Sequence, residues 1–143
     1  MESTILVADD DSELLGLYQQ YLTRSGYRVL TASGGVECLS IIRNDLPTVI
    51  MLSVNLPWGG TDGLLDCLHE ESDQRSGPSV ILTGSTADEN VAELREEPCV
   101  LRYLRKPFLM GKLLDCIRAI ESDASGDQRL TVSARPRPAA ACS

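Results

Sequence analysis

Carboxylates, hydroxyls and a lysine stand at the ends of several short apolar runs in this 143-residue chain. In chain order, the residues at or just beyond these run ends are Asp9, Asp10, Asp11, Ser53, Asn55, Thr83, Tyr103 and Lys106. Crowded carboxylates repel one another unless a cation compensates them, so the first group suggests an oxygen-ligand Mg²⁺ site. The hydroxyl of Thr83 and the ammonium group of Lys106 could both bind an anion. Alternatively, the carboxylates form an acidic turn that caps the first helix. Lys106 is alternatively an ordinary surface lysine.

These residues act together only if the elements before them end at one edge. Strand-like apolar runs alternate with amphipathic helical segments, and each run is short enough to be a buried parallel strand. Strands are predicted at 4–9, 27–32, 48–53, 79–83 and 99–104. Asp11 or Ser12 is expected to cap the helix that Gly26 ends, and later helices are expected at 35–44, around 64–68, and over 88–95 and 109–121.

Five successive βα units with right-handed crossovers predict an α/β fold, namely a flavodoxin-like (βα)5 doubly wound parallel sheet with strand order 2-1-3-4-5. Ligands of such sheets bind outside the carboxyl ends of the strands, which brings the polar residues into one crevice. We expect a single domain over 1–121. Residues 122–143 lose apolar periodicity and become small and polar, so they are expected to form a flexible C-terminal tail.

Composition excludes several classes of function. The formal net charge of −8 argues against nucleic-acid binding, which needs clustered Lys and Arg. The five cysteines are widely spaced without a metal-binding pattern, so they are read as reduced residues of an intracellular protein. Because no leader-like start and no long apolar run is present, we predict a cytoplasmic protein with no membrane span.

Four motifs stand in order at the predicted strand ends: "ILVADD" (5–10), "NLP" (55–57), "ILTG" (81–84) and "YLRKPF" (103–108). With these motifs the chain resembles the receiver domain of bacterial response regulators, the module that takes phosphate from a histidine kinase. The resemblance covers about residues 4–121, so 1–121 is expected to be a receiver-like domain. It is carried by the four motifs together, since each of them alone is weak.

The resemblance implies a role for each matching residue. Asp9 and Asp10 would hold Mg²⁺ together with the backbone carbonyl of Asn55. Thr83 and Lys106 would contact phosphoryl oxygens. Tyr103 would change rotamer on activation.

The phosphoacceptor aspartate of the family belongs two residues before Asn55, where this chain has Ser53. A serine hydroxyl cannot form an acyl phosphate and is weakly nucleophilic without a base, and the single histidine, His69, lies in the predicted third helix. We therefore predict a stand-alone, degenerate receiver that is not phosphorylated at Ser53 and is no enzyme. Mg²⁺ binding is expected to be weakened by loss of the third carboxylate.

Other interpretations of Ser53 stay open. The chain is alternatively an ordinary phospho-accepting receiver with an engineered Asp-to-Ser change, or the acceptor is Ser53 itself, Asp11 or Asp62. The same loop also departs from the family, because the insert "WGGT" (58–61) is two residues longer than the usual spacing.

An enzyme of another class is the distant alternative. Asp9 and Asp11 have the spacing of the nucleophile and acid/base in haloacid-dehalogenase-like phosphatases, with Thr83 and Lys106 as the hydroxyl and lysine of that family. Glu13 departs from its pattern, however, and no acidic pair follows Lys106 at a later strand end. A nucleotide site at "SGG" (33–35) is weaker still, because no GxGxxG follows the first strand.

The expected partners are proteins. The resemblance implies a histidine kinase or another signalling protein, which would dock on the face formed by the fourth helix, fifth strand and fifth helix. A homodimer through the same face is a candidate assembly, and Glu93, Arg102 and Arg118 are candidate contacts there, although a merely solvated face would carry the same residues.

Overall fold

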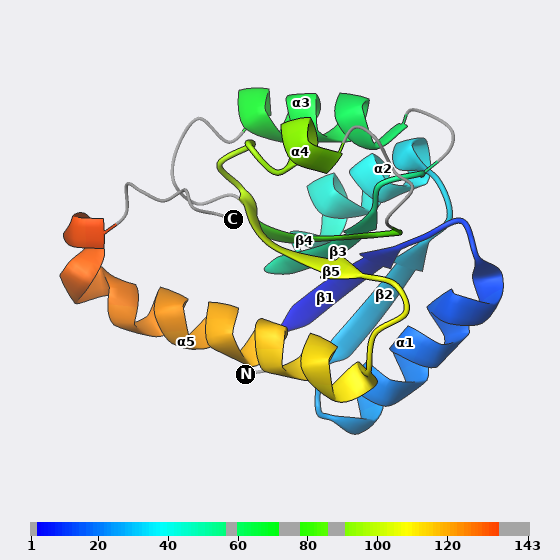
Figure 1. The fold of residues 1–143 in the computed structure, drawn as a ribbon, viewed down its shortest axis with the longest axis horizontal. Coiled ribbons are helices and arrows are strands. Elements are labelled where there is room, and N and C mark those ends of the chain that lie inside the picture. The colour runs from blue at the N-terminus through cyan, green and yellow to red at the C-terminus, as the bar shows by residue number, and fades with distance from the viewer. Residues whose placement is uncertain (1–2, 57–59, 72–77, 86–90, 135–143) are drawn as a thin grey trace.

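The computed structural model describes residues 3–56, 60–71, 78–85 and 91–134. Strands and helices alternate along them (Figure 1). The strands are β1 (Thr4–Ala8), β2 (Arg28–Ala32), β3 (Val49–Ser53), β4 (Ser79–Gly84) and β5 (Val100–Arg105). The helices are α1 (Ser12–Arg24), α2 (Gly35–Asp45), α3 (Gly60–Glu71), α4 (Val91–Leu94) and α5 (Met110–Ala134).

The sheet has the order β2-β1-β3-β4-β5, and all its pairs are parallel, as expected for a flavodoxin-like fold. β3 lies at its centre and is buried along its whole length, which explains its uninterrupted apolar sequence. Because side chains of a strand alternate between two faces, the sheet separates two cores. One contains Leu6, Ile50 and Leu82, and the other contains Val7, Met51 and Ile81.

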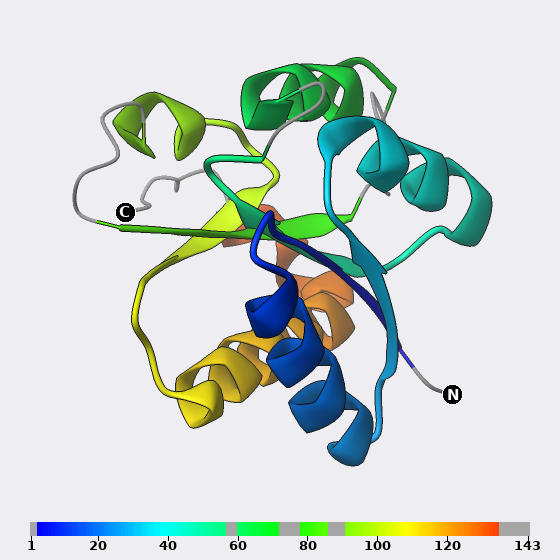
Figure 2. The same ribbon diagram turned by 90° about the vertical axis from the view of Figure 1, so that its right-hand side faces the viewer.

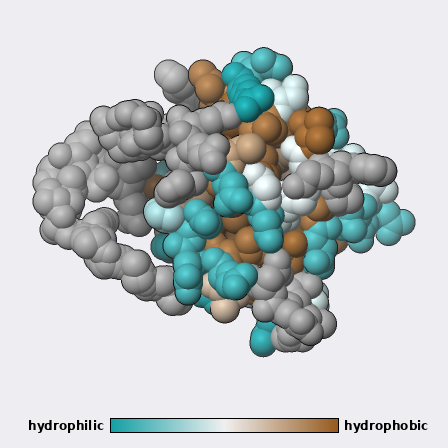
Figure 3. Space-filling model, turned by 90° about the horizontal axis from the view of Figure 1, so that it is seen from above, coloured by the Kyte–Doolittle hydropathy of each residue, from teal (hydrophilic) through white to brown (hydrophobic). Residues whose placement is uncertain are grey.

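Helices cover both faces (Figure 2). α2, α3 and α4 contribute Cys38, Leu65 and Leu94 to the first core, whereas α1 and α5 contribute Tyr18 and Ile117 to the second. The outer side of the α2, α3 and α4 layer mixes hydrophobic and hydrophilic residues where its side chains are described (Figure 3). Each helix thus buries one face and presents the other to solvent.

α1 begins and ends with the predicted residues. Oδ1 of Asp11 accepts hydrogen bonds from the backbone N–H groups of Glu13 and Leu14 at 3.0 and 3.3 Å, which satisfies two free donors of the first turn. After the cap residue Ser25, Gly26 has φ +100°, a conformation that favours glycine. The acidic turn after β1 therefore does include a helix cap, and Asp11 provides it.

Two helices differ from the expected bounds. α4 is described over Val91–Leu94, and the start of its expected range lies outside the described residues. α5 continues past residue 121 to Ala134, and its last turns extend beyond the strands (Figure 1). Its backbone hydrogen bonds are local and no proline occurs between Pro107 and Pro136, so the helix continues where apolar periodicity stops. The division into a domain (1–121) and a flexible tail (122–143) stays a prediction.

Candidate functional site

Four of the polar residues predicted to converge stand at or just beyond strand ends, on one face of the sheet, whereas Tyr103 packs against the core on the other face. Asp9, Ser53, Thr83 and Lys106 each stand two residues after a member of the core under α1 and α5: Val7, Met51, Ile81 and Leu104. Since side chains repeat every second residue along a strand, all four point toward that face. Ser53 and Thr83 are register partners, and Val54 N–H donates to the carbonyl of Thr83 at 2.9 Å.

Burial separates this edge from the rest of the surface. Among the described residues, the buried polar side chains are Asp9, Ser53, Thr61 and Thr83, each at most 3% exposed. Asp9 directly follows β1, Ser53 ends β3, Thr83 is the last residue but one of β4, and Thr61 lies in the first turn of α3. A buried polar group without a partner is costly, so buried polar side chains need hydrogen bonds or ion pairs. These four residues therefore mark the edge of the sheet where polar contacts, rather than apolar packing, surround the side chains.

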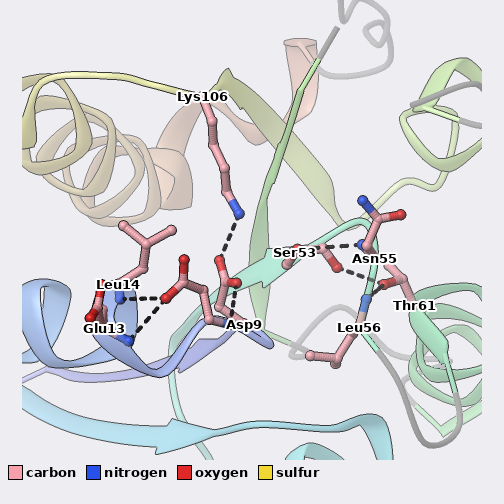
Figure 4. Close-up of polar contacts among 9 residues, drawn as sticks. Asp9, Glu13, Leu14, Ser53, Asn55, Leu56, Thr61 and Lys106 are labelled. Carbon is pink, nitrogen blue, oxygen red and sulfur yellow. Dashed lines mark hydrogen bonds and ion pairs between the residues drawn. The ribbon is translucent and has the colours of Figure 1, made fainter. Parts of the chain in front are cut away.

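An ion pair links the two outer members of the site. Nζ of Lys106 donates to Oδ2 of Asp9 at 2.8 Å, and the backbone N–H of Asp11 donates to Oδ1 of Asp9 at 3.0 Å (Figure 4). The lysine side chain is 25% exposed and the carboxylate 1%. The backbone N–H of Lys106 also donates to the carbonyl of Gly84 at 2.7 Å, which holds the end of β5 beside β4. The expected carboxylate partner of Lys106 is therefore Asp9.

Asp10 is exposed and lies next to this pair. Partial burial raises the pKa of its carboxyl above the ordinary value, a hydrogen bond with Asp9 and the negative charge of Asp9 raise it further, and Lys106 opposes the shift. The two adjacent carboxylates thus still repel each other although Lys106 is present.

Ser53 ends β3 and lies beside the ion pair (Figure 4). Its Oγ accepts a hydrogen bond from the backbone N–H of Asn55 at 3.3 Å. Its carbonyl accepts one from Oγ1 of Thr61 at 2.6 Å, and the same Oγ1 accepts one from the backbone N–H of Leu56 at 3.3 Å. Thr61 therefore fastens the start of α3 to the end of β3. Residues 57–59, which include the inserted Trp58, lie outside the described residues.

Thr83 and Tyr103 complete the predicted set. Oγ1 of Thr83 is buried with no hydrogen-bond partner among the described residues, which leaves a donor at the carboxyl edge of β4. The phenol of Tyr103 donates to the carbonyl of Ser85 at 3.4 Å, and the guanidinium of Arg95 lies over its ring, 5.2 Å from the centroid. Sequence reasoning missed Arg95 and Thr61, since neither stands at a strand end.

The residues predicted to hold magnesium include two carboxylates, Asp9 and Asp10. Within the described residues, no group of three or more His, Cys, Asp or Glu side chains is arranged to hold a metal. What remains is the pair Asp9 and Asp10 with the carbonyl of Asn55, and Lys106 already compensates part of the charge. Mg²⁺ often takes only one or two carboxylates and several waters, so weakened Mg²⁺ binding here stays a prediction.

The described cysteines are free thiols, namely Cys38, Cys67, Cys99 and Cys116. Burial raises the pKa of Cys38 to about 12 and that of Cys99 to about 11. Both thiols stay protonated near neutral pH, so neither is an activated nucleophile. None of the helices in the described part of the chain is both long and apolar enough to cross a membrane.

Comparisons with known proteins agree with this architecture. The family model described as the response regulator receiver domain matches residues 5–118. Response regulator MprA of Mycobacterium sp. strain KMS is 35% identical over 129 residues, which cover 90% of this chain and 54% of that protein. Transcriptional regulatory protein PrrA of Mycobacterium tuberculosis is 32% identical over 117 residues, or 81% of this chain and 48% of that protein. The chain thus spans about half the length of these curated relatives.

Solved structures show the same fold. A CheY-like receiver domain protein from Methanospirillum hungatei JF-1 superposes with TM-score 0.77 at 26% identity, covering 88% of this chain and 100% of that one. The signal receiver domain of a putative Luxo repressor protein from Vibrio parahaemolyticus gives TM-score 0.78 at 20% identity, covering 94% and 100%. At 20% identity the second likeness concerns the fold alone.

Proposed function

Because this chain belongs to the family of response-regulator receiver domains of two-component signalling, we propose that it is a pseudo-receiver whose Ser53 occupies the phosphoacceptor position. The observation that carries the proposal is the place of Ser53. It ends the central strand, two residues before Asn55, on the same face of the sheet as Asp9, Thr83 and Lys106. An aspartate there would complete a set of three carboxylates.

The contacts of Ser53 support a silent acceptor. A serine attacks a phosphoryl group well only when a base takes its proton. Oγ of Ser53 is engaged by the N–H of Asn55, and the carboxylate of Asp9 accepts hydrogen bonds from Lys106 and Asp11. Asp11 itself caps α1, which argues against its use as a substitute acceptor or as the acid/base of a phosphatase. The proposed role is therefore non-enzymatic.

Mg²⁺ belongs to the proposal as a weak ligand held by Asp9, Asp10 and the carbonyl of Asn55. When bound, it would neutralise charge at this edge of the sheet. Thr83 and Lys106 keep the positions from which they would contact phosphoryl oxygens, and Tyr103 keeps that of the switch residue. The chain thus retains the surroundings of the reaction but lacks the carboxylate that accepts the group.

Signalling would then proceed through protein contacts in the cytoplasm. A histidine kinase or another signalling protein is the proposed partner, and α4, β5 and α5 form the proposed face, with a homodimer through it as a second assembly. β5 is an edge strand with exposed Leu101, Arg102 and Arg105. The net charge of −8 makes nucleic acid an unfavourable partner, and no membrane association is proposed.

Intact-mass analysis after incubation with acetyl phosphate and Mg²⁺ tests the proposal. We expect no phosphoryl gain for this chain and a gain of one phosphoryl group for Ser53→Asp, because the substitution restores the carboxylate that forms an acyl phosphate. Titration with Mg²⁺ should show tighter binding by Ser53→Asp. Phosphoryl gain on this chain, mapped to Ser53, would overturn the pseudo-receiver. The natural codon at position 53 separates an evolved serine from an engineered one.

A further inference from the structure

Three separate segments meet at the ring of Tyr103. Tyr103 lies in β5, half-buried, and packs against the core that contains Leu82 and Leu94. Its phenol donates to the carbonyl of Ser85, just beyond β4. The guanidinium of Arg95, just beyond α4, lies over the ring at 5.2 Å from the centroid. The ring of Tyr103 in β5 therefore contacts one residue just beyond β4 and one just beyond α4.

These contacts differ in strength. The phenol-to-carbonyl distance of 3.4 Å is longer than the 2.5–3.0 Å usual for an O–H···O bond, so this bond is weak. The distance of 5.2 Å lies within the roughly 6 Å over which a cation is attracted to an aromatic face. The contact between Arg95 and the ring therefore has favourable cation–π geometry, whereas the hydrogen bond to Ser85 is long.

The backbone fixes Arg95 relative to the sheet. Its N–H donates to the carbonyl of Val91 at 2.9 Å, and the N–H of Glu97 donates to that of Leu94 at 3.2 Å, which continues the last turn of α4. Leu94 is 6% exposed and belongs to the core against which the ring packs. A shift of α4 would therefore carry the guanidinium with it.

We propose that Arg95 is a positioning residue that holds Tyr103 beside Ser85, so that the position of the ring depends on α4 rather than on a phosphoryl group at the carboxyl edge. This inference rests on the proposed pseudo-receiver function and assigns its regulation. Ser85 lies two residues beyond Thr83, and the carbonyl of Gly84 binds the N–H of Lys106. A partner protein whose carboxylate forms an ion pair with the guanidinium of Arg95 would remove it from the ring. The ring of Tyr103 would then be free to move near Thr83 and Lys106.

Fluorine NMR of the full chain labelled with 3-fluorotyrosine tests the inference, without Mg²⁺ or a phosphate donor. The chain has four tyrosines, and Tyr103→Phe assigns the relevant signal. Arg95→Gln removes the charge but keeps a long side chain. In Arg95→Gln we expect the Tyr103 signal to move toward its position in the urea-unfolded chain. The ratio of molecules with the ring beside Ser85 to molecules with the ring away from it should fall about two- to fivefold.

Two further variants isolate the contact. Arg95→Lys keeps the charge but loses the flat guanidinium, so its signal should lie between those of this chain and Arg95→Gln. Arg102→Gln removes an exposed arginine one residue from Tyr103, whose own bond is to the carbonyl of Leu101, and should leave the signal in place. The signals of Tyr18, Tyr21 and Tyr27 report whether each variant remains folded.

An unmoved Tyr103 signal in folded Arg95→Gln would overturn the inference, as would an equal movement in Arg102→Gln. These outcomes are independent of the mass measurement above. Phosphorylation of Ser53 would remove the proposed function while the contact between Arg95 and Tyr103 could still be demonstrated. A silent Ser53 with an unmoved Tyr103 would leave the pseudo-receiver intact and reject the role of Arg95.

Discussion

At the scale of single residues, the ion pair between Asp9 and Lys106 is the contact on which the site depends most. Asp9 is 1% exposed, so its charge has lost most of its water, and Lys106 lies 2.8 Å away. Exposed ion pairs contribute little to stability, but removing one partner of a buried pair leaves an uncompensated charge. Lys106 therefore stabilises the fold even if no phosphoryl group ever reaches it.

Lys106→Met should lower the free energy of unfolding by roughly 1–3 kcal/mol, below the full cost for a buried pair because the lysine is partly exposed. Urea unfolding followed by circular dichroism measures the change. Lys112→Met, at an exposed position of α5, is the matched control and should stay within about 0.5 kcal/mol. In the Asp9→Asn background the effect of Lys106→Met should shrink. Equal effects at positions 106 and 112 would contradict this account of the pair.

Residue types at the strand ends could be predicted from the sequence, whereas most of their partners could not. Alternation and strand order bring Asp9, Ser53, Thr83 and Lys106 to one edge and face. The long lysine side chain, however, could reach a carboxylate or a bound anion. Arg95 was not predicted as a neighbour of Tyr103, because that contact depends on how the short α4 packs against β5.

At the scale of elements, local sequence determines starts and ends where a side chain or a glycine fixes the backbone. Asp11 and Gly26 bound α1 through a side-chain cap and a positive φ, and both effects act over a few residues. α5 ends at Ala134, two residues before Pro136, and nothing in the local sequence ends it at residue 121. Glu121 accepts hydrogen bonds from Ser3 at 2.6 Å and Tyr27 at 2.9 Å, which anchors the helix at the edge of the domain, but the helical backbone continues beyond this anchor.

The connection from β3 to α3 offers a test at this scale. Thr61→Val keeps the branched shape but removes the hydroxyl that bonds the carbonyl of Ser53 and the N–H of Leu56. Both groups lie in a buried environment, so unfolding should become easier by roughly 1–3 kcal/mol. Thr23→Val, at an exposed position of α1, controls for the change of residue type and should have little effect. Equal midpoints of urea unfolding for the two variants would show that Thr61 does not fasten the loop.

At the scale of the whole molecule, the fold follows from a pattern rather than from individual residues. Strand-like and helical segments alternate, parallel neighbours need crossovers, and right-handed crossovers place helices on both faces. These constraints predict a doubly wound parallel sheet, and the order 2-1-3-4-5 is that of the flavodoxin-like layout with which the pattern was identified. They do not say how tightly the two cores are linked, because that depends on the packing of β3, whose side chains enter both cores in turn.

Substitutions on the two faces of β3 test that link. Leu52→Ala removes a side chain from the core under α2, α3 and α4, and Met51→Ala removes one from the core under α1 and α5. Each side chain is at most 1% exposed, so each variant should lose roughly 2–5 kcal/mol, whereas Leu17→Ala, at 52% exposure, should lose much less. Because one strand serves both cores, unfolding should remain a single transition. Urea midpoints from circular dichroism and from tyrosine signals of both faces should coincide, and two separate midpoints in Leu52→Ala would mean that the cores unfold independently.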